Sequence, residues 1–372
     1  MHGTKNTVTS VNLSKDHKFP ASDHTGFPMQ QDIRDLSLEE LAAHLKSVDA
    51  EPFRAQQIFQ WIYQKGAWGF DAMSNVSREL RERLQKDFVL KPNDIAQKVI
   101  SEDGTTKFLF DLHDHEKIES VLIPTKTRTT ACISTQAGCK FGCKFCASGI
   151  GGWKRNLTCA EIVTQVLHVK EEALKHQRPL TNIVFMGTGE PMDNFVNLMK
   201  AIRIINSNKG INIGARHITI STVGVVPKIK ELALEGLQVE LAISLHGYDN
   251  PSRDVLMPVN KKYPFDELIA ACREYVRVTH RQITFEYILI KDVTCTPHAV
   301  ACLKKAFKGI ICKMNLIPYN PVSEFDHKTP SKEEMVSFRN RLEENGVHAT
   351  IRTPRGKDVN AACGQLRHSH KQ

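Results

Sequence analysis

The sequence has no apolar run long enough to cross a membrane and no recognisable export signal. None of its stretches approaches the roughly 20 consecutive apolar residues that a membrane-spanning helix needs. The first residues lack the basic segment followed by an apolar segment that is typical of a secretory signal. We therefore expect a cytoplasmic protein without membrane attachment. Its 41% hydrophobic and 24% charged residues are ordinary for a globular chain.

The sequence also lacks the aromatic motifs of the common RNA-binding modules. Its net charge of +9 nevertheless favours a polyanionic partner, although many proteins that bind no nucleic acid are equally basic. Basic residues gather in five short clusters, each of which could equally be a solvated helix face or loop. The clusters are Arg78-Arg81-Arg83-Lys86, Lys126-Arg128, Lys154-Arg155, Lys304-Lys305-Lys308 and Arg352-Arg355-Lys357.

Ten cysteines are many for a chain expected in the reducing cytoplasm, where disulfide frameworks are rare. They therefore indicate metal binding or catalysis. Three of them form the pattern Cys-x3-Cys-x2-Cys at Cys139, Cys143 and Cys146. We expect a short strand at residues 131–135 and a helix from Thr158, so the three thiols should lie on a loop at the carboxyl end of a strand.

Three converging thiolates can hold a [4Fe-4S] cluster by three of its irons and leave the fourth iron open for a substrate. A structural zinc site accepts similar spacing but needs a fourth protein ligand, which this run does not supply. Three buried cysteines with a purely structural role are a further alternative. We favour the cluster, because structural cysteines rarely come as three within eight residues.

The first two parts of the chain differ in apolar content. Residues 1–31 are polar with few large apolar side chains, which predicts a flexible tail. Residues 32–92 predict a small helical domain that begins with a capping box formed by Ser37 and Glu40. Further helices are expected from Arg54 to Lys65 and from Ser77 to Lys86. This domain carries no group of obvious catalytic type and could be a structural cap.

The remainder of the chain is rich in strand patterns. Residues 93–128 alternate apolar and polar residues and predict a β-hairpin extension. Strand and helix patterns then alternate over residues 129–322, followed by residues 323–372 with one helix, one strand and a loop. The strands of the alternating part are expected at 130–134, 182–186, 216–222, 238–244, 283–290 and 312–317. Its helices are expected at 158–175, 194–207, 225–235, 264–278 and 297–308.

Six strands separated by helices imply an α/β fold with parallel pairing. A partial (β/α)6 barrel fits this pattern, with the active site at the carboxyl ends of the strands. A doubly wound open sheet is the competing architecture. We favour the barrel because polar residues follow several different strands, as they would around a rim.

Several of these polar residues could bind a cofactor. Gly187-Thr188-Gly189-Glu190-Pro191 follows the second strand of the barrel, and its glycines allow a ligand to approach the backbone closely. Hydroxyl, imidazole and amide groups suit a ribose and a carboxylate. Each residue alone could be a simple cap or turn residue, and His246 could also act as a base, but together they predict cofactor contacts. The residues that lie at or just beyond strand ends are Ser221, Ser244, Leu245, His246 and Asn320.

The motifs described above, together with three others, resemble one known family. The further motifs are Thr129-Thr130-Ala131-Cys132, Arg155-Asn156-Leu157-Thr158 and Asn360-Ala361-Ala362-Cys363-Gly364-Gln365-Leu366. In these motifs the sequence resembles the RlmN/Cfr family of radical S-adenosylmethionine RNA methyltransferases, over residues 36–366. The resemblance implies a [4Fe-4S] cluster on the three cysteines and two molecules of S-adenosylmethionine per turnover. It also implies that residues 32–92 are an accessory RNA-binding domain.

The resemblance also assigns roles to individual residues. Gly189 and Glu190 would hold the methionyl amine of S-adenosylmethionine. Cys363 would be methylated and carry the methyl group to the RNA base, and Cys132 would later release the RNA by forming a disulfide with it. Glu119 would accept a proton from the base, although spacing alone does not distinguish it among the 41 acidic residues. The other cysteines are expected to be structural: Cys159, Cys272, Cys295, Cys302 and Cys312.

The implied reaction places a methyl group on carbon 2 of adenine by radical chemistry, because this electron-poor carbon is a poor nucleophile. The implied substrates are an adenine of the peptidyl transferase centre in 23S ribosomal RNA and the adenine 3′ of the anticodon in transfer RNA. An electron donor such as flavodoxin would be needed, and we expect a monomer. A Cfr-like enzyme that methylates carbon 8 is one alternative. A zinc-bearing RNA-binding protein without enzymatic activity is a more distant one.

Overall fold

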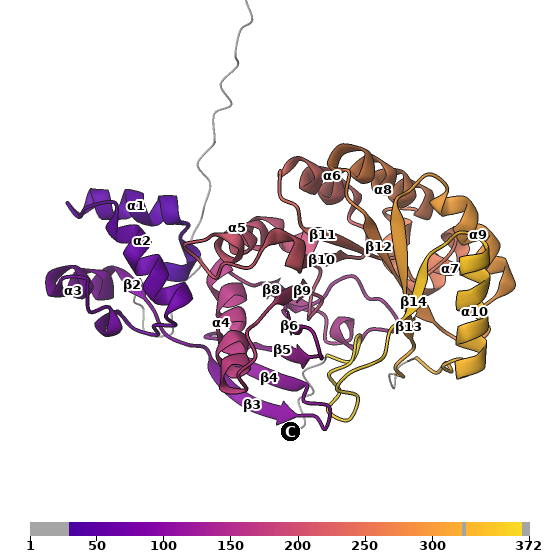
Figure 1. The fold of residues 1–372 in the computed structure, drawn as a ribbon, viewed down its shortest axis with the longest axis horizontal. Coiled ribbons are helices and arrows are strands. Elements are labelled where there is room, and N and C mark those ends of the chain that lie inside the picture. The colour runs from indigo at the N-terminus through magenta and orange to yellow at the C-terminus, as the bar shows by residue number, and fades with distance from the viewer. Residues whose placement is uncertain (1–29, 322–324, 367–372) are drawn as a thin grey trace, which may run out of the picture.

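The structure, a computed structural model, describes residues 30–321 and 325–366. The tail predicted at residues 1–31 lies almost wholly outside them, as does the end of the segment predicted at residues 323–372. Figure 1 shows a helical unit at the amino-terminal end, beside one large sheet with helices packed on it. No helix in the described part of the chain has both the length and the apolar character that a membrane crossing requires.

The helical unit contains α1 (Leu38–Ser47), α2 (Arg54–Phe59) and α3 (Arg78–Asp87). The capping box predicted for α1 is present: Glu40 N donates to Ser37 Oγ at 3.1 Å, and Ser37 N donates to Glu40 Oε2 at 2.6 Å. The helix predicted from Arg54 to Lys65 is less regular than expected, because α2 passes into a π-helix at Gln60–Gln64. Two short strands, β1 (Gln31–Asp32) and β2 (Phe88–Val89), pair in parallel and close the unit.

The large sheet has ten strands in the order β14-β13-β12-β11-β10-β9-β6-β5-β4-β3. Its six central strands are parallel and match the predicted ones to within two residues at each end. They are β6 (Thr129–Cys132), β9 (Asn182–Phe185), β10 (Ile218–Thr222), β11 (Glu240–Ser244), β12 (Ile283–Leu289) and β13 (Cys312–Pro318). The α/β fold with a partial (β/α)6 barrel is therefore confirmed.

The helices between these strands also agree with prediction. They are α4 (Cys159–Lys175), α5 (Phe195–Asn206), α6 (Val226–Leu234), α8 (Phe265–Thr279) and α9 (Pro297–Phe307). The structure adds the short α7 (Asn250–Leu256), which the sequence did not predict. After the barrel, α10 (Lys332–Glu344) leads into β14 (Ala349–Ile351), which pairs in parallel with β13 and extends the sheet.

The strands predicted as a hairpin extension continue the same sheet. They are β3 (Asp94–Ile100), β4 (Thr106–Asp111) and β5 (Lys117–Pro124), all antiparallel to their neighbours. The link is β5, which pairs with β6, so that Val121 lies opposite Cys132. Both faces of β5 are consequently covered, one by α4 and the other by the carboxyl-terminal segment.

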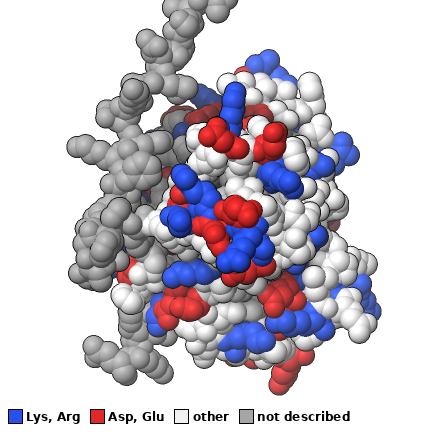
Figure 2. All heavy atoms as spheres, turned by 90° about the vertical axis from the view of Figure 1, so that its left-hand side faces the viewer, with Lys and Arg blue, Asp and Glu red and all other residues white. Residues whose placement is uncertain are grey.

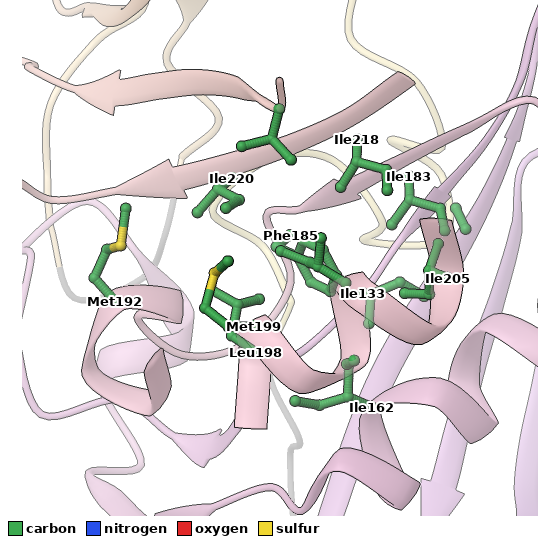
Figure 3. Packing of buried hydrophobic residues seen from close by; sticks show 14 of the residues in the cluster. Ile133, Ile162, Ile183, Phe185, Met192, Leu198, Met199, Ile205, Ile218 and Ile220 are labelled. Carbon is green, nitrogen blue, oxygen red and sulfur yellow. The ribbon is translucent and has the colours of Figure 1, made fainter. Parts of the chain in front are cut away.

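The main hydrophobic core lies between the parallel strands and the helices that cover them. Figure 3 shows Ile183 and Phe185 of β9 and Ile218 and Ile220 of β10 facing Leu198 of α5. All five side chains are buried. Alternate residues along each strand point to opposite faces, so the residues between these core positions face the interior of the barrel.

Candidate active site

The largest group of predicted site residues converges on one cavity at the carboxyl ends of the parallel strands. Ten of the thirteen residues predicted from the sequence line it. They are Cys139, Cys143, Cys146, Gly189, Glu190, Ser221, Ser244, His246, Asn320 and Cys363. Cys132, Glu119 and Leu245 do not line this cavity.

The three clustered cysteines lie on the loop between β7 (Gln136–Gly138) and β8 (Trp153–Asn156). Gly138 begins this loop with φ of 74°, and a Cβ atom there would lie 1.8 Å from the carbonyl oxygen of Gly152. Only glycine fits this position. Inside the loop, Cys146 N donates to Cys143 O at 3.0 Å, which folds the chain back, and all three cysteines line the cavity.

The arrangement of these thiols fits a cluster better than a single zinc ion. Among the described residues, only one group of three potential metal ligands has its ligand atoms within 4.8 Å of one another. That group lies elsewhere in the fold and does not include these three cysteines. The sulfurs of Cys139, Cys143 and Cys146 are thus spread more widely than one tetrahedral ion requires. Burial raises the pKa of Cys139 to about 12 and that of Cys143 well above its usual value, so a cationic group must displace their protons.

A second wall of the cavity is the loop after β9. Gly189 has φ of 104°, and a Cβ atom there would lie 2.5 Å from the Cβ of Gln136. The next residue, Glu190, is 2% exposed and accepts hydrogen bonds from Met192 N at 3.1 Å and Val223 N at 2.8 Å. Burial nevertheless raises the pKa of its carboxyl group to about 7. The tight turn at Gly189 and the two backbone amides thus hold the Glu190 carboxyl group in the wall of the cavity.

His246 also lines the cavity, two residues after β11, in the left-handed conformation with φ of 52°. Its Nδ1 accepts a hydrogen bond from Ile288 N at 3.1 Å, which places the proton of the neutral ring on Nε2. The ring packs edge-to-face on Phe145 of the cysteine loop at 4.8 Å. Burial lowers the pKa of His246 to about 3, so the ring is neutral near pH 7 and suits binding rather than base catalysis.

Ser221 and Ser244 extend the polar lining around the rim. Ser221 is the last residue but one of β10, Ser244 is the last residue of the neighbouring β11, and their hydroxyl oxygens lie 3.4 Å apart. Leu245 does not line the cavity, and its side chain is fully buried in the core. Only its backbone is polar near the site, with N donating to Glu286 O at 3.0 Å and O accepting from Arg253 at 2.8 Å.

The carboxyl-terminal segment brings Cys363 against the cysteine loop. Ala147 N donates to Gly364 O at 2.7 Å, and Ser148 Oγ donates to Leu366 O at 2.9 Å. On the barrel side, Asn320 Nδ2 donates to Cys363 O at 3.2 Å. Residues more than 200 positions apart in sequence are thus held together, and the Cys363 thiol shares the cavity with the three clustered cysteines.

Cys132 and Glu119 lie beside this cavity, on the sheet face that the carboxyl-terminal segment covers. Cys132 is buried with Val121, Ala361 and Leu366. Glu119 is two residues before Val121 on β5 and therefore points to the same face. Its carboxylate pairs with Lys107 at 3.1 Å. All ten cysteines lie in the described residues and all are free, so the disulfide implied between Cys132 and Cys363 is not present in this structure.

Three charged residues at the site were not predicted. Glu286 and Arg352 both line the cavity, 3.7 Å apart. Burial raises the pKa of Cys132, and the Arg352 guanidinium opposes that rise. Arg352 also acts on Cys363, whose side chain is exposed. Arg253 is fully buried and donates to the carbonyls of Leu245 and, at 2.9 Å, Val223. Glu286 stands inside the otherwise apolar run of β12, and this position could have marked it as a site residue from the sequence alone.

Two of the four basic residues in the cluster predicted on α3 pair with carboxylates of the same helix. Arg78 pairs with Glu82 and Arg83 pairs with Asp87, both at 2.8 Å, while Arg81 donates to Asp71 O at 2.9 Å. Figure 2 shows the face on this side of the molecule, where blue and red side chains are interspersed without a continuous basic patch. The α3 cluster therefore offers less free positive charge than its sequence indicates.

Comparison with known proteins agrees with this geometry. Residues 133–294, which include the three clustered cysteines, match the Radical SAM superfamily. Fold and site together define a radical S-adenosylmethionine enzyme, a class that uses a [4Fe-4S] cluster and S-adenosylmethionine. Relatives from Clostridium novyi and Bacillus pumilus, both named probable dual-specificity RNA methyltransferase RlmN, are 44% and 45% identical over 341 and 340 residues. The chain belongs to the RlmN family of radical S-adenosylmethionine RNA methyltransferases.

The similarity extends over nearly the whole length of this chain and of each relative. The two alignments cover 91% of this chain and 98% and 94% of the relatives. The crystal structure of a radical SAM methyltransferase from Sphaerobacter thermophilus has a TM-score of 0.88 at 44% identity, covering 91% of this chain and 99% of that one. Residues 31–90 match the ribosomal RNA large subunit methyltransferase N-terminal domain, which corresponds to the helical unit.

Proposed function

We propose that the protein methylates carbon 2 of adenine in two RNA classes, using Cys363 as the methyl carrier. The RNA targets are an adenine in the peptidyl transferase centre of 23S ribosomal RNA and the adenine 3′ of the anticodon in transfer RNA. The observation that carries the proposal is the position of Cys363, held by Asn320 and by the cysteine loop inside the cavity that Cys139, Cys143 and Cys146 share. The names of the relatives, which specify dual specificity for RNA, support the substrate class.

The cavity residues fit the cofactors of the class. Cys139, Cys143 and Cys146 would each bind one iron of the [4Fe-4S] cluster and leave the fourth iron facing the cavity. Glu190 and the backbone at Gly189 would receive the methionyl amine. Ser221, Ser244, His246 and Asn320 would contact the ribose and carboxylate, His246 donating through Nε2. When bound, the cluster and S-adenosylmethionine supply a 5′-deoxyadenosyl radical.

The chain's own residues then position and resolve the RNA adduct. Cys363 accepts a methyl group on its sulfur and presents it to the cavity, where the methyl carbon would lose one hydrogen atom to the 5′-deoxyadenosyl radical and then bond to carbon 2 of the base. The adduct would give up one electron, and after release its former methylene carbon would take up a proton to become the new methyl group. Glu119 takes the proton that leaves carbon 2. The Cys132 sulfur attacks the Cys363 sulfur, the sulfur–carbon bond breaks with its electron pair left on the methylated base, and a disulfide forms. Reduction of that disulfide restores both thiols.

Arg352 supports this last step electrostatically. Burial raises the pKa of Cys132 to about 12, so its thiol is neutral near pH 7. The attacking species must be a thiolate. The Arg352 guanidinium lowers the pKa of Cys132 and so favours the thiolate from which the attack starts. Mass spectrometry of nucleosides from RNA methylated by the protein tests the proposed function, with 2-methyladenosine as the expected product.

The role of Glu190 leads to a prediction about pH. With its pKa raised to about 7, its carboxyl group is largely protonated below that pH and ionised above it. An ammonium ligand binds the ionised form, so the affinity for S-adenosylmethionine should fall as the pH is lowered from 8 to 6. Glu190→Gln should remove this dependence and weaken binding by about 1.5–3 kcal/mol, or roughly ten- to hundredfold.

Anaerobic equilibrium dialysis of the cluster-loaded protein with labelled S-adenosylmethionine measures both effects. The matched control is Glu286→Gln, since Glu286 lines the same cavity on a different strand and its pKa is also raised by burial. That variant should keep the steep dependence near pH 7. If the affinity of the unmodified protein for S-adenosylmethionine did not vary with pH, Glu190 would not be the group that binds the amine.

A further inference from the structure

A second group of potential metal ligands lies outside the cavity. Asp249 immediately precedes α7, while His298 and Cys302 lie on α9. Since His298 and Cys302 are four residues apart on a helix, their side chains share one face of α9. One ligand atom from each of the three residues lies within 4.8 Å of the other two. The sequence pattern had placed Cys302 among the structural cysteines.

The distances within this group match a tetrahedral ion. Zinc bonds of about 2.3 Å to sulfur and about 2.0–2.1 Å to nitrogen give a sulfur–nitrogen separation of about 3.6 Å across a tetrahedral angle. Cys302 Sγ and His298 Nε2 are 3.5 Å apart. Asp249 Oδ1 accepts a hydrogen bond from Ser252 N at 2.8 Å, which fixes the carboxylate and leaves Oδ2 for an ion.

We propose that Asp249, His298 and Cys302 bind a zinc-like divalent cation, with water as the fourth ligand. The ring of Tyr248 packs edge-on against the His298 ring at 5.6 Å and restricts its orientation. His298 is exposed while Cys302 and Asp249 are half-buried, so an ion can enter from solvent. A thiol, an imidazole and a carboxylate together favour zinc over magnesium or calcium, which prefer oxygen ligands only.

The ion would act as a structural clip between two parts of the barrel. Asp249 follows β11 by five residues, on the same loop as His246, which lines the cavity. His298 and Cys302 belong to the helix that follows β12. A bond from each side to one ion would restrain the loop after β11 against α9, and binding only to the folded state would raise its stability. None of the three ligands lines the cavity, so the clip is independent of the proposed chemistry.

Metal analysis of the cluster-loaded protein tests this site. After anaerobic dialysis against chelator-buffered Zn²⁺, the protein should hold one zinc per chain in addition to its iron. Cys302→Ala and His298→Ala should each lose that zinc without loss of iron. The control Cys295→Ala should keep it, because Cys295 is half-buried near the start of α9, its thiol bonds to the Glu334 carbonyl, and it is not one of the three ligands. Zinc should also raise Tm by about 2–4 °C in every zinc-binding form.

Two results would overturn the proposal. One is that the unmodified protein binds iron but no zinc. The other is Cys302→Ala that retains the same zinc and the same rise in Tm as Cys295→Ala. Either result would mean that the 3.5 Å contact between Cys302 and His298 is only a thiol–imidazole hydrogen bond.

Discussion

Changing any one of Cys139, Cys143 or Cys146 to alanine is expected to remove the iron–sulfur chromophore and abolish RNA methylation. Each thiolate would hold one iron, and the loop that carries them is fixed at Gly138 by its close approach to Gly152. With one thiolate removed, the two that remain would not be enough to hold the cluster in the cavity that the three cysteines line. Iron and sulfide analysis with anaerobic absorption spectra measures the loss directly.

The matched control for these variants is Cys272→Ala. Cys272 is fully buried in α8 and packs in the main core, so its replacement leaves a small cavity but touches no proposed ligand. It should keep its iron and most of its activity, with a modest loss of stability. A cluster variant that retained full iron and activity would rule out this loop as the cluster site.

Changing Cys132 to alanine is expected to trap a covalent protein–RNA adduct. After carbon on the Cys363 sulfur has bonded to the base, the chain and the RNA share a carbon–sulfur linkage. Cys132 can reach that sulfur, because it packs with Ala361 and Leu366, which flank Cys363 on either side. Without it the reaction should stop after addition, and the protein should migrate with RNA on a denaturing gel.

Two further variants control this experiment. Changing Cys363 as well should remove the adduct, since no carbon–sulfur linkage can form. Changing Cys312, a half-buried cysteine on β13 outside the cavity, should leave turnover without an adduct. Normal turnover in Cys132→Ala, or inactivity with no adduct, would assign Cys132 a packing role alone.

Local sequence patterns were sufficient to predict the framework of the barrel. Capping boxes at Ser37 and Thr158 set the starts of α1 and α4, and side-chain periodicity distinguished strands from helices. Because parallel strands all end at one edge of the sheet, polar residues that follow them must gather there. This rule alone explains why residues as distant as Glu190 and Asn320 line one cavity.

The features that prediction missed depend on contacts between distant segments. The alternation in residues 93–128 predicts strands but not their partner, and only the pairing of Val121 with Cys132 makes them part of the large sheet. Leu245 follows a strand as His246 does, yet adjacent residues point in opposite directions, and Leu245 faces the core. Glu119 was named only through the family resemblance, because no local pattern reports that the carboxyl-terminal segment covers its face.

The ligands of the proposed zinc clip show the same limit. His298 and Cys302 have helical spacing that places them on one face, which the sequence alone can indicate. Asp249 is 49 residues before His298, and only the fold places its carboxylate beside them. The sequence alone therefore does not identify Asp249 as a possible ligand beside Cys302, and a structural role for Cys302 is the expectation.

Nucleoside mass spectrometry of 23S ribosomal and transfer RNA is the most direct test of the proposed function. RNA from a strain without the gene should lack 2-methyladenosine at both proposed positions. The unmodified gene should restore the modification in both RNA classes, while Cys363→Ala should restore neither. If the unmodified gene instead restored 8-methyladenosine, or if Cys363→Ala restored 2-methyladenosine, the account of carbon 2 methylation through Cys363 would be contradicted.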